Sequence, residues 1–285
     1  MFSRGGTMPV IAMTGEMGSF GKDVASGVAE KLGLRPIHHE FVDTLSEELH
    51  MNKNAVSRLV DGKPNLADRW RVDGPALNLF AAEHVLDIAL QDNVIIRGCG
   101  ATYLLRSISH IPCIRIYAPL ALRIERMMQR TGTDDYDRVL HEIRLSDAAH
   151  ARTLRTLFGV HYEDPWLYDV VFNTERDSIE FCIDEMIGMV NHPSFAETAE
   201  SRRLLEQMAL KAHIRAALKK SPSTAKVYIT VQISDSKVTL EGIVDNEREQ
   251  HAVEEIVAGV RGVVALENHL KSMTGTRYLA TASSI

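Results

Sequence analysis

The chain has 285 residues, of which 45% are hydrophobic and 25% charged, and its formal net charge is −6. This length fits one large domain or two ordinary ones, and the composition is typical of a soluble globular protein. The acidic balance excludes the broad positive field that holds DNA or RNA, so no nucleic-acid partner is expected. No uncharged apolar stretch approaches the ~20 residues of a membrane-spanning helix.

The N-terminal region lacks the apolar core of a signal peptide, because the apolar run from Pro9 to Met13 is too short. Three cysteines occur, without the spacing of a metal site: Cys99, Cys113 and Cys182. Reduced thiols packed as small hydrophobic side chains are their expected state. These features predict a cytoplasmic protein.

The first two thirds of the chain alternate short apolar runs with longer segments of helical spacing. Strands are expected at residues 10–13, 35–38, 94–96, 113–117 and 169–172. Helices are expected at 22–32, 46–60, 76–90, 120–129, 136–156 and 178–190, the last capped by Ser178. Strands with little polar alternation, separated by helices, indicate a parallel α/β sheet with helices on both faces and ligands at the carboxyl ends of its strands.

The pattern changes after residue 192. Residues 193–202 are small and polar without a sustained period, and we interpret them as a linker. A helix at 204–219, alternating strands at 227–231 and 237–241, a helix at 246–260 and a strand at 263–270 follow. The predicted organisation is an α/β domain at 1–192, the linker, a small α+β domain (αββαβ) at 203–273 and a flexible tail at 274–285.

A glycine-rich segment follows the first strand and reads Gly15-Glu16-Met17-Gly18-Ser19-Phe20-Gly21-Lys22-Asp23. Such a strand-to-helix turn exposes backbone amides and a helix N-terminus, which bind phosphate, and Lys22 adds a charge-assisted contact. In the strict P-loop pattern, four residues separate the first glycine from a Gly-Lys pair, and Ser or Thr follows that pair. Here five residues separate Gly15 from Gly21-Lys22, and Asp23 follows. The alternative interpretation is therefore a glycine turn that only allows a helix to pack closely on the sheet.

The loop resembles that of the cytidylate-kinase-like proteins, which reads Gly-Ser-Gly-Gly-(Arg/Lys)-(Glu/Asp). Phe20 stands at a glycine position, where a positive φ would carry a cost for any other residue. Longer co-linear similarities cover residues 118–126, 158–165 and 167–174. The resemblance implies a P-loop kinase fold and phosphoryl transfer from ATP, with Mg²⁺, to a nucleoside monophosphate such as CMP.

The resemblance also implies roles for individual residues. ATP would be bound by Gly15, Gly18, Ser19, Phe20, Gly21, Lys22 and Asp23, and the metal by Asp23 or Ser26. The acceptor would be bound by Asp43 and Arg97. Catalytic charge stabilisation would come from Lys22, Arg126, Arg130, Arg144 and Arg152. Arg123, Arg126 and Arg130 share one helix face by their spacing, and with the arginines of the following helix they flank a predicted lid turn.

The second lid helix departs from the family. Relatives usually show Asp-Arg-x-Arg where this chain has Asp147-Ala148-Ala149-His150. Because a catalytic arginine can supply several powers of ten in rate, two hypotheses stay open. The chain is an active nucleoside monophosphate kinase, or it is a degenerate nucleotide-binding protein that regulates partner or lipid binding through its C-terminal domain.

The C-terminal domain resembles a BON domain. The similarity rests on residues 238–244, 247–252 and 260–264 and on Asn268. It implies binding of phospholipid surfaces or partner proteins and no catalysis. We expect a docking or regulatory role, and a passive stabilising or dimerising appendage is the alternative.

Overall fold

The computed structural model describes residues 9–37, 46–47, 51–60, 74–98 and 100–273. The chain divides into two compact units, residues 1–202 and 203–285, and each is described by itself. The boundaries predicted from the sequence stay predictions.

The first unit contains a five-stranded sheet of order β2-β3-β1-β4-β5, with every pair parallel. Its strands are β1 (Val10–Gly15), β2 (Arg35–Ile37), β3 (Val94–Arg97), β4 (Cys113–Tyr117) and β5 (Val170–Asn173). Its helices are α1 (Gly21–Leu32), α3 (Lys53–Val60), α5 (Gly74–Leu90), α6 (Ala101–Leu105), α7 (Leu120–Thr131), α8 (Tyr136–Phe158) and α9 (Ile179–Asn191). Short 3-10 turns lie at Pro165–Leu167 and Pro193–Phe195.

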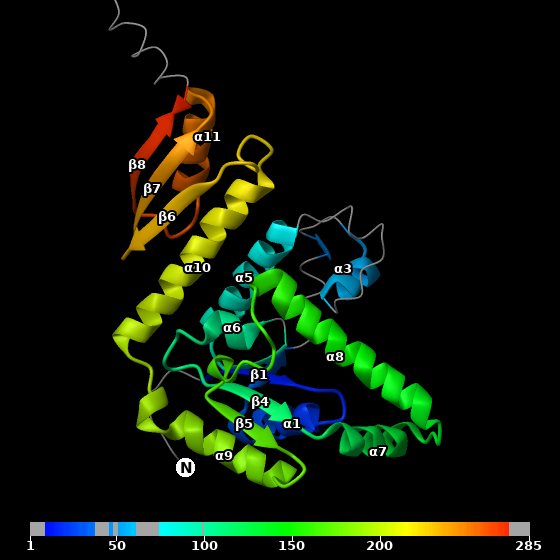
Figure 1. Ribbon diagram of the computed structural model, residues 1–285. Coiled ribbons are helices and arrows are strands. Elements are labelled where there is room, and N and C mark those ends of the chain that lie inside the picture. The colour runs from blue at the N-terminus through cyan, green and yellow to red at the C-terminus, as the bar shows by residue number, and fades with distance from the viewer. Residues whose placement is uncertain (1–8, 38–45, 48–50, 61–73, 99, 274–285) are drawn as a thin grey trace, which may run out of the picture. The chain divides into compact units, whose positions relative to one another are not determined.

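Both faces of this sheet are covered, as the continuous apolar strands predict. Helices α1 and α9 lie on one side, and α5 and α6 lie on the other (Figure 1). The α1 and α9 side buries Ile11, Ile95, Ile114 and Ile116 with Val24, Val28 and Met186. Since the strands are parallel, the last residues of β1, β3 and β4 lie at the same edge of the sheet; they are Gly15, Arg97 and Tyr117. The predicted doubly covered parallel sheet is confirmed.

Two helix predictions differ from the structure. The helix expected at 46–60 is interrupted, because Met51 and Asn52 are not helical. The side chain of Asn52 accepts the amide of Ala55 at 2.8 Å and so starts α3 afresh. Helix α10 (Ala199–Lys220) begins inside the predicted linker. Thr198 and Ser201 exchange side-chain-to-backbone hydrogen bonds of 3.1 and 3.0 Å, a reciprocal cap that fixes its first turn.

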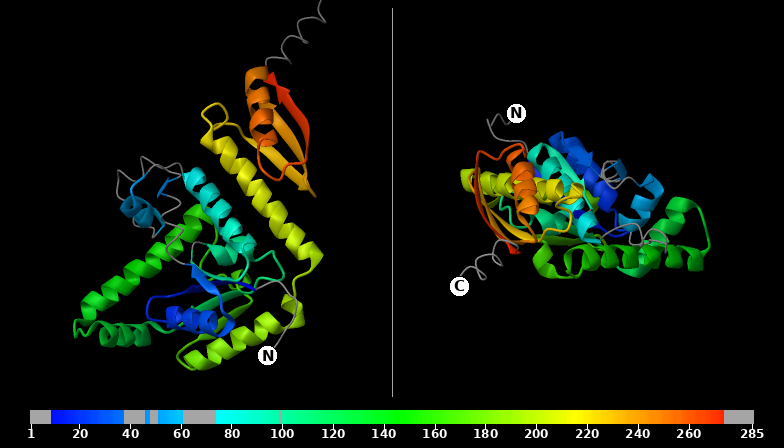
Figure 2. Two further views of the ribbon diagram at one scale, coloured as in Figure 1. Left: turned by 180° about the vertical axis from the view of Figure 1, so that it is seen from behind. Right: turned by 90° about the horizontal axis from the view of Figure 1, so that it is seen from above.

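The second unit holds a three-stranded sheet of order β6-β7-β8. Strands β6 (Ile229–Ser234) and β7 (Lys237–Val244) are antiparallel, and β8 (Ala265–Ser272) runs parallel to β7. Helix α11 (Glu247–Ala258) lies along one face of this sheet (Figure 2). The core joins Ile214 and Leu218 of α10 to Leu240, Val253 and Leu270. The predicted small αββαβ domain is confirmed.

Candidate functional site

The described residues form a pocket of about 750 Å³ at the carboxyl ends of β1 and β3. Its size is within the range of small-molecule sites. It is lined by three parts of the first unit: the glycine loop with the start of α1, the end of β3, and the facing sides of α7 and α8. The lining includes Gly15, Gly18, Phe20, Gly21, Lys22, Asp23, Arg97, Arg126, Arg130 and His150.

The loop between β1 and α1 is tightly wound. Gly18 has φ +82°, and a Cβ there would lie 2.8 Å from the carbonyl oxygen of Arg123, so only glycine fits. Ser19 is fully buried, and its hydroxyl and amide both bind the carbonyl oxygen of Glu16, at 2.7 and 3.0 Å. Phe20 has φ +63°, in the left-handed region that glycine adopts without strain. For a bulky residue this costs about 1–3 kcal/mol.

The first turn of α1 is open to a ligand. Phe20 is its N-cap residue and has no side-chain hydrogen bond to the helix. The amides of Gly21, Lys22 and Asp23 precede the first intrahelical bond, which Val24 donates to Phe20. Within the described residues, neither Lys22 nor Arg130 has a hydrogen-bond or ion-pair partner, and both line the pocket. Uncapped amides and two unpaired cations form a site suited to phosphate groups.

Arg126 binds the loop rather than pointing freely into the pocket. Its guanidinium donates to the carbonyl oxygen of Gly18 at 3.3 Å, to the hydroxyl of Thr174 at 2.9 Å and to the carbonyl oxygen of Thr174 at 2.6 Å. Its Cζ atom lies 4.0 Å from the centre of the Phe20 ring. The predicted lid arginine therefore joins α7 to the glycine loop and to the segment after β5.

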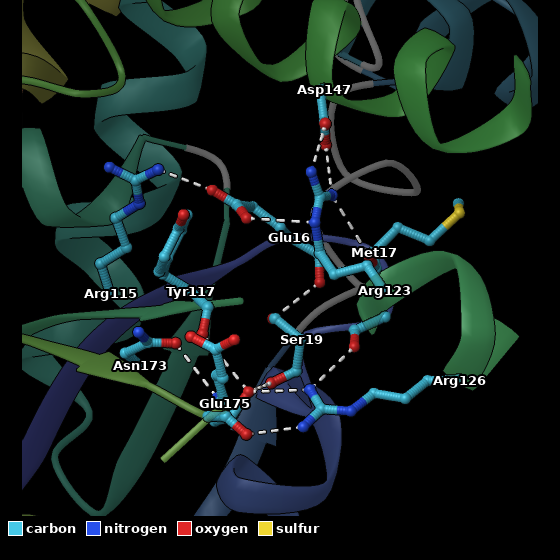
Figure 3. Close-up of polar contacts among 12 residues, drawn as sticks. Glu16, Met17, Ser19, Arg115, Tyr117, Arg123, Arg126, Asp147, Asn173 and Glu175 are labelled. Carbon is cyan, nitrogen blue, oxygen red and sulfur yellow. Dashed lines mark hydrogen bonds and ion pairs between the residues drawn. The ribbon is translucent and has the colours of Figure 1, made fainter. Parts of the chain in front are cut away.

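Arg123 lies at the centre of a group of four charged side chains, of which three are 7–11% exposed and the fourth, Asp147, is 34% exposed. It forms a two-pronged bond with Asp147 of α8, at 2.7 and 2.9 Å, and an ion pair of 3.4 Å with Glu16. The other oxygen of Glu16 accepts from Arg115 of β4 at 2.6 Å. Figure 3 shows the carboxylates of Glu16 and Asp147 approaching Arg123 from different sides. We call these four residues the Glu16 network.

The Glu16 network is electrically balanced, with two arginines and two carboxylates. Burial acts to lower the pKa of Arg123, but its hydrogen bond with Asp147 and the charges of Asp147 and Glu16 raise that pKa above its ordinary value. Arg123 also donates to the carbonyl oxygen of Met17 at 3.3 Å. The network thus ties the loop to β4, α7 and α8 without leaving a net charge for a ligand.

The far side of the pocket carries Arg97, the last residue of β3. Burial lowers the pKa of its guanidinium, against the opposing charge of Asp23. Asp23 itself lines the pocket, so a carboxylate and a cation face the same space. No group of three or more His, Cys, Asp or Glu side chains suited to a metal occurs in the described part of the chain.

The remaining predicted site residues are distributed as follows. Arg144 and Arg152 of α8 and Ser26 of α1 are exposed and do not line the pocket, and buried Ser19 does not line it either. Asp43 lies outside the described residues. The roles predicted for all these residues stay predictions.

Sequence reasoning missed two residues that shape the loop. Thr174 is buried at the end of β5 and binds Arg126, yet it belongs to no charge or glycine pattern. Glu16 lies within the glycine segment, and its buried pairing had one signal, a lone arginine between the apolar residues of strand 113–117. His150, at the position of a family arginine, lines the pocket, and its ring stacks on Tyr162 at 6.3 Å.

Known proteins resemble both units. Residues 10–176, more than half of the chain, match the family model described as cytidylate kinase-like family, and residues 208–272 match the BON domain model. No helix in the described parts of the chain is long and apolar enough to cross a membrane.

Two curated relatives are similar over the first unit. A protein named cytidylate kinase from Staphylothermus marinus is 28% identical over 108 residues, 37% of this chain and 59% of that protein. Another of that name from Methanococcus aeolicus is 23% identical over 177 residues, 60% of this chain and 91% of that protein.

Among solved structures, an uncharacterized protein from Eubacterium ventriosum superposes with a TM-score of 0.50 at 16% identity. The superposition covers 65% of this chain and 99% of that protein, and it supports the fold of the first unit. The family match, the parallel sheet and the glycine loop at its carboxyl edge agree: the chain belongs to the cytidylate kinase-like family and carries a C-terminal BON domain.

Proposed function

We propose that the protein transfers a phosphoryl group from ATP to a nucleoside monophosphate, with CMP as the first candidate acceptor. The observation that carries this proposal is the pocket at the start of α1, where uncapped amides meet the unpaired cations Lys22 and Arg130. Phosphoryl transfer depends mainly on positioning and on stabilising charge, and this arrangement supplies both. The names of the two archaeal relatives support the same reaction.

In this proposal the chain's residues have separate tasks. Lys22 and the amides of Gly21 to Asp23 hold the phosphates of ATP. Arg130 stabilises charge on the transferred group, and Arg97 holds the acceptor phosphate across the pocket. This division follows from their positions on the pocket lining.

Asp23 fits a magnesium ion better than Ser26 does. Mg²⁺ is usually held by one or two carboxylates together with substrate phosphates, and the Asp23 carboxylate lines the pocket beside the phosphate-binding amides. Ser26 is exposed and outside that lining. When bound, the ion neutralises charge on the phosphate oxygens.

The test is an assay of ATP consumption and nucleoside diphosphate formation with the full chain, using CMP, dCMP, UMP, AMP and GMP. We expect product with at least one acceptor, and Lys22→Ala should lower kcat about 100-fold or more, as for removal of one oxyanion-binding donor. Lys31→Ala is the matched control, since Lys31 lies on the same helix and pairs with Asp184 at the surface. No product with any acceptor would contradict the proposal.

A second candidate function follows from the state of the arginines. Arg123 and Arg126 are bound to protein groups, and Ala148 and His150 stand where relatives carry arginines. These arginine contacts and replacements are consistent with a protein that binds nucleotide without turnover and regulates its BON domain through that binding. Calorimetry that detects ATP binding, together with an assay that detects no ADP, would favour it, and a Lys22-dependent turnover would exclude it.

For the BON domain we propose docking to an anionic phospholipid surface. Tyr228 and Ile243 are 87% and 64% exposed, and they are the chain neighbours of Ile229 and Gly242, which pair in the β6–β7 register. Two exposed lysines lie close to these side chains. Lys226 is two residues before Tyr228 in the chain, and Lys271 of β8 pairs with Ile243 in the β7–β8 register. Aromatic and apolar side chains beside lysines suit an interface with acidic headgroups.

Co-sedimentation of the full chain with vesicles tests this docking. We expect binding to phosphatidylglycerol-containing vesicles, weaker binding to phosphatidylcholine vesicles, and loss of binding in a Tyr228→Ser, Ile243→Ser variant. Equal binding by both vesicle types, or none, would exclude an anionic lipid surface and leave a protein partner.

A further inference from the structure

We infer that Phe20 and Arg126 form a positioning pair that holds the glycine loop in its phosphate-binding shape. The inference rests on the proposed function and goes beyond it, because it concerns the one loop position where this chain departs from the glycine of its relatives. It also gives Arg126 a task different from the one expected for a lid arginine, which is to stabilise charge on the transferred phosphoryl group.

The guanidinium of Arg126 contacts the loop and its support through two nitrogens and one face. Its Nη1 donates to the carbonyl oxygen of Gly18 and to the hydroxyl of Thr174, and its Nη2 donates to the carbonyl oxygen of Thr174. The flat face lies over the Phe20 ring at 4.0 Å. Only a planar fork of donors with a stacking face can make these contacts together, which a lysine cannot do.

Thr174 fixes the other side of the same loop. It is buried, and its hydroxyl lies 3.0 Å from the carbonyl oxygen of Ser19 and 3.3 Å from that of Tyr117. The carbonyl groups of two consecutive loop residues, Gly18 and Ser19, are therefore bound by Arg126 and Thr174, which bind each other (Figure 3). With the carbonyl groups fixed on this side, the amides of the following turn keep their direction toward the pocket.

Phe20 gives this support its stacking face. Its backbone is left-handed, a conformation that glycine reaches without cost and phenylalanine does not. The ring contact with Arg126 offsets that cost, so the loop is stiffer than a loop with glycine at this position. A variant that loses the ring but keeps the Cβ atom should therefore bind ATP more weakly than a variant with glycine at this position.

The experiment is a double-mutant cycle on the full chain, with the dissociation constant for ATP measured by calorimetry. We expect Phe20→Leu to weaken binding about tenfold, because leucine keeps the backbone cost and loses the ring. Phe20→Gly should weaken it only about threefold. Arg126→Lys should weaken it about tenfold, and the Phe20→Leu, Arg126→Lys double variant should stay well short of the hundredfold loss that additivity predicts.

Additive losses would overturn the inference, since they would mean that Phe20 and Arg126 affect ATP binding independently of each other. Arg138→Gln is the matched control for loss of an arginine. Arg138 forms an exposed ion pair with Glu142 on α8 and does not line the pocket, so this variant should bind ATP as the wild type does. For variants that turn over, the KM for ATP should rise while kcat changes little. A lower kcat at an unchanged KM would assign Arg126 to the transfer step and overturn the inference.

Hydrogen exchange without nucleotide separates this inference from the proposed function. Amides of residues 18–22 should exchange faster in Phe20→Leu and Arg126→Lys than in the wild type, at unchanged exchange in β3 and β4. Unchanged loop exchange overturns the positioning pair. If the loop loosens as expected but the wild type binds no ATP, the proposed function fails and the pair stands as a support of the loop.

Discussion

The two units place their charges in opposite ways. In the first unit, Arg115 and Arg123 form ion pairs with Glu16 of the glycine loop, and all three side chains are only 7–11% exposed. In the second, Lys237 and Glu267 pair at 2.7 Å on an open sheet face, with both side chains about half exposed. The difference follows from the sheets, because helices cover both faces of the parallel sheet that contains Arg115, whereas the β6–β8 sheet keeps one face in water.

This contrast teaches where each unit can act. A balanced and mostly buried charge group gives the first unit a fixed loop, and the cations Lys22, Arg97 and Arg130 line the pocket beside it. The second unit has no comparable interior group among its described residues, and its apolar core holds the sheet together. Its exposed strands are suited to surface contacts instead.

The largest expected effect is from Glu16→Gln. Loss of this carboxylate leaves Arg115 and Arg123 buried with Asp147 alone, and removal of one partner from a buried pair costs several kcal/mol, here about 4 kcal/mol. Urea unfolding of the first unit measures the change. Glu125→Gln, exposed on α7, is the control, and a change below about 1 kcal/mol for Glu16→Gln would show that the contrast in burial has no energetic meaning.

The next effect tests whether the units fold separately, as the predicted boundary requires. Leu240→Ala removes a fully buried side chain from the small core of the second unit and should cost about 3 kcal/mol. A domain of this size has little stability in reserve, so it should unfold alone. Circular dichroism should then show two transitions with ATP binding retained, and a single shared transition would contradict independent folding.

A smaller effect concerns His110, which lies between α6 and β4 in the first unit. Burial lowers its pKa, helped by Arg202 and opposed by Glu197 and Asp92. Its Nδ1 atom lies 2.8 Å from the hydroxyl of Ser201. Since the unfolded chain takes up the proton first, stability should be complete above about pH 6.5 and decrease as the pH falls below it.

Urea unfolding at pH 7 and pH 5.5 measures this loss, which should reach about 1 kcal/mol for the wild type. His110→Gln cannot titrate and should lose less over the same interval. An equal loss in both proteins would mean that other groups cause it.

The smallest effect is expected on the open sheet face. Lys237→Gln removes a surface ion pair that water and salt already screen, and the unfolding midpoint should not change within error. A clear decrease in the unfolding midpoint would mean that this exposed pair stabilises its unit as a buried pair does, and the contrast between the two units would not hold. Proteolysis offers a related test, since the linker predicted at residues 193–202 leads us to expect the first cleavage between Asn191 and Ser201.

The structure sharpens that proteolysis prediction. Ser201 is buried, and Arg202 binds Asp92 at 2.7 Å and the carbonyl oxygen of Leu90 at 3.3 Å. A fragment ending at residue 192 therefore loses contacts within the first unit. Cleavage at 196–198 fits these contacts better than cleavage after 199.

The sheet could be predicted because its signal is local. Runs such as Val94 to Ile96 are apolar without alternation, and that property by itself indicates a strand buried on both faces. Ser178 likewise caps α9 as predicted, by accepting the amide of Phe181 at 3.1 Å. The helix expected at 46–60 was wrong because a single asparagine cap, Asn52, outweighed a continuous helical pattern.

The site could be predicted only in outline. Spacing placed Arg123, Arg126 and Arg130 on one helix face, but it did not reveal what each faces. Two of them bind backbone carbonyl groups of the glycine loop, and such acceptors exist in every residue and leave no mark in a sequence. The glycine of the family loop raised a positive φ at Phe20 as one alternative, and it gave no sign of the Arg126 guanidinium against the Phe20 ring.

The Glu16 network has a consequence for heat. The free-energy cost of removing charged groups from water falls as the temperature rises, because their hydration is entropically unfavourable. The apolar contacts around β1 gain no comparable advantage. On warming, a growing share of the stability at the glycine loop therefore comes from its four paired charges, and the loop should be among the last parts of its unit to loosen.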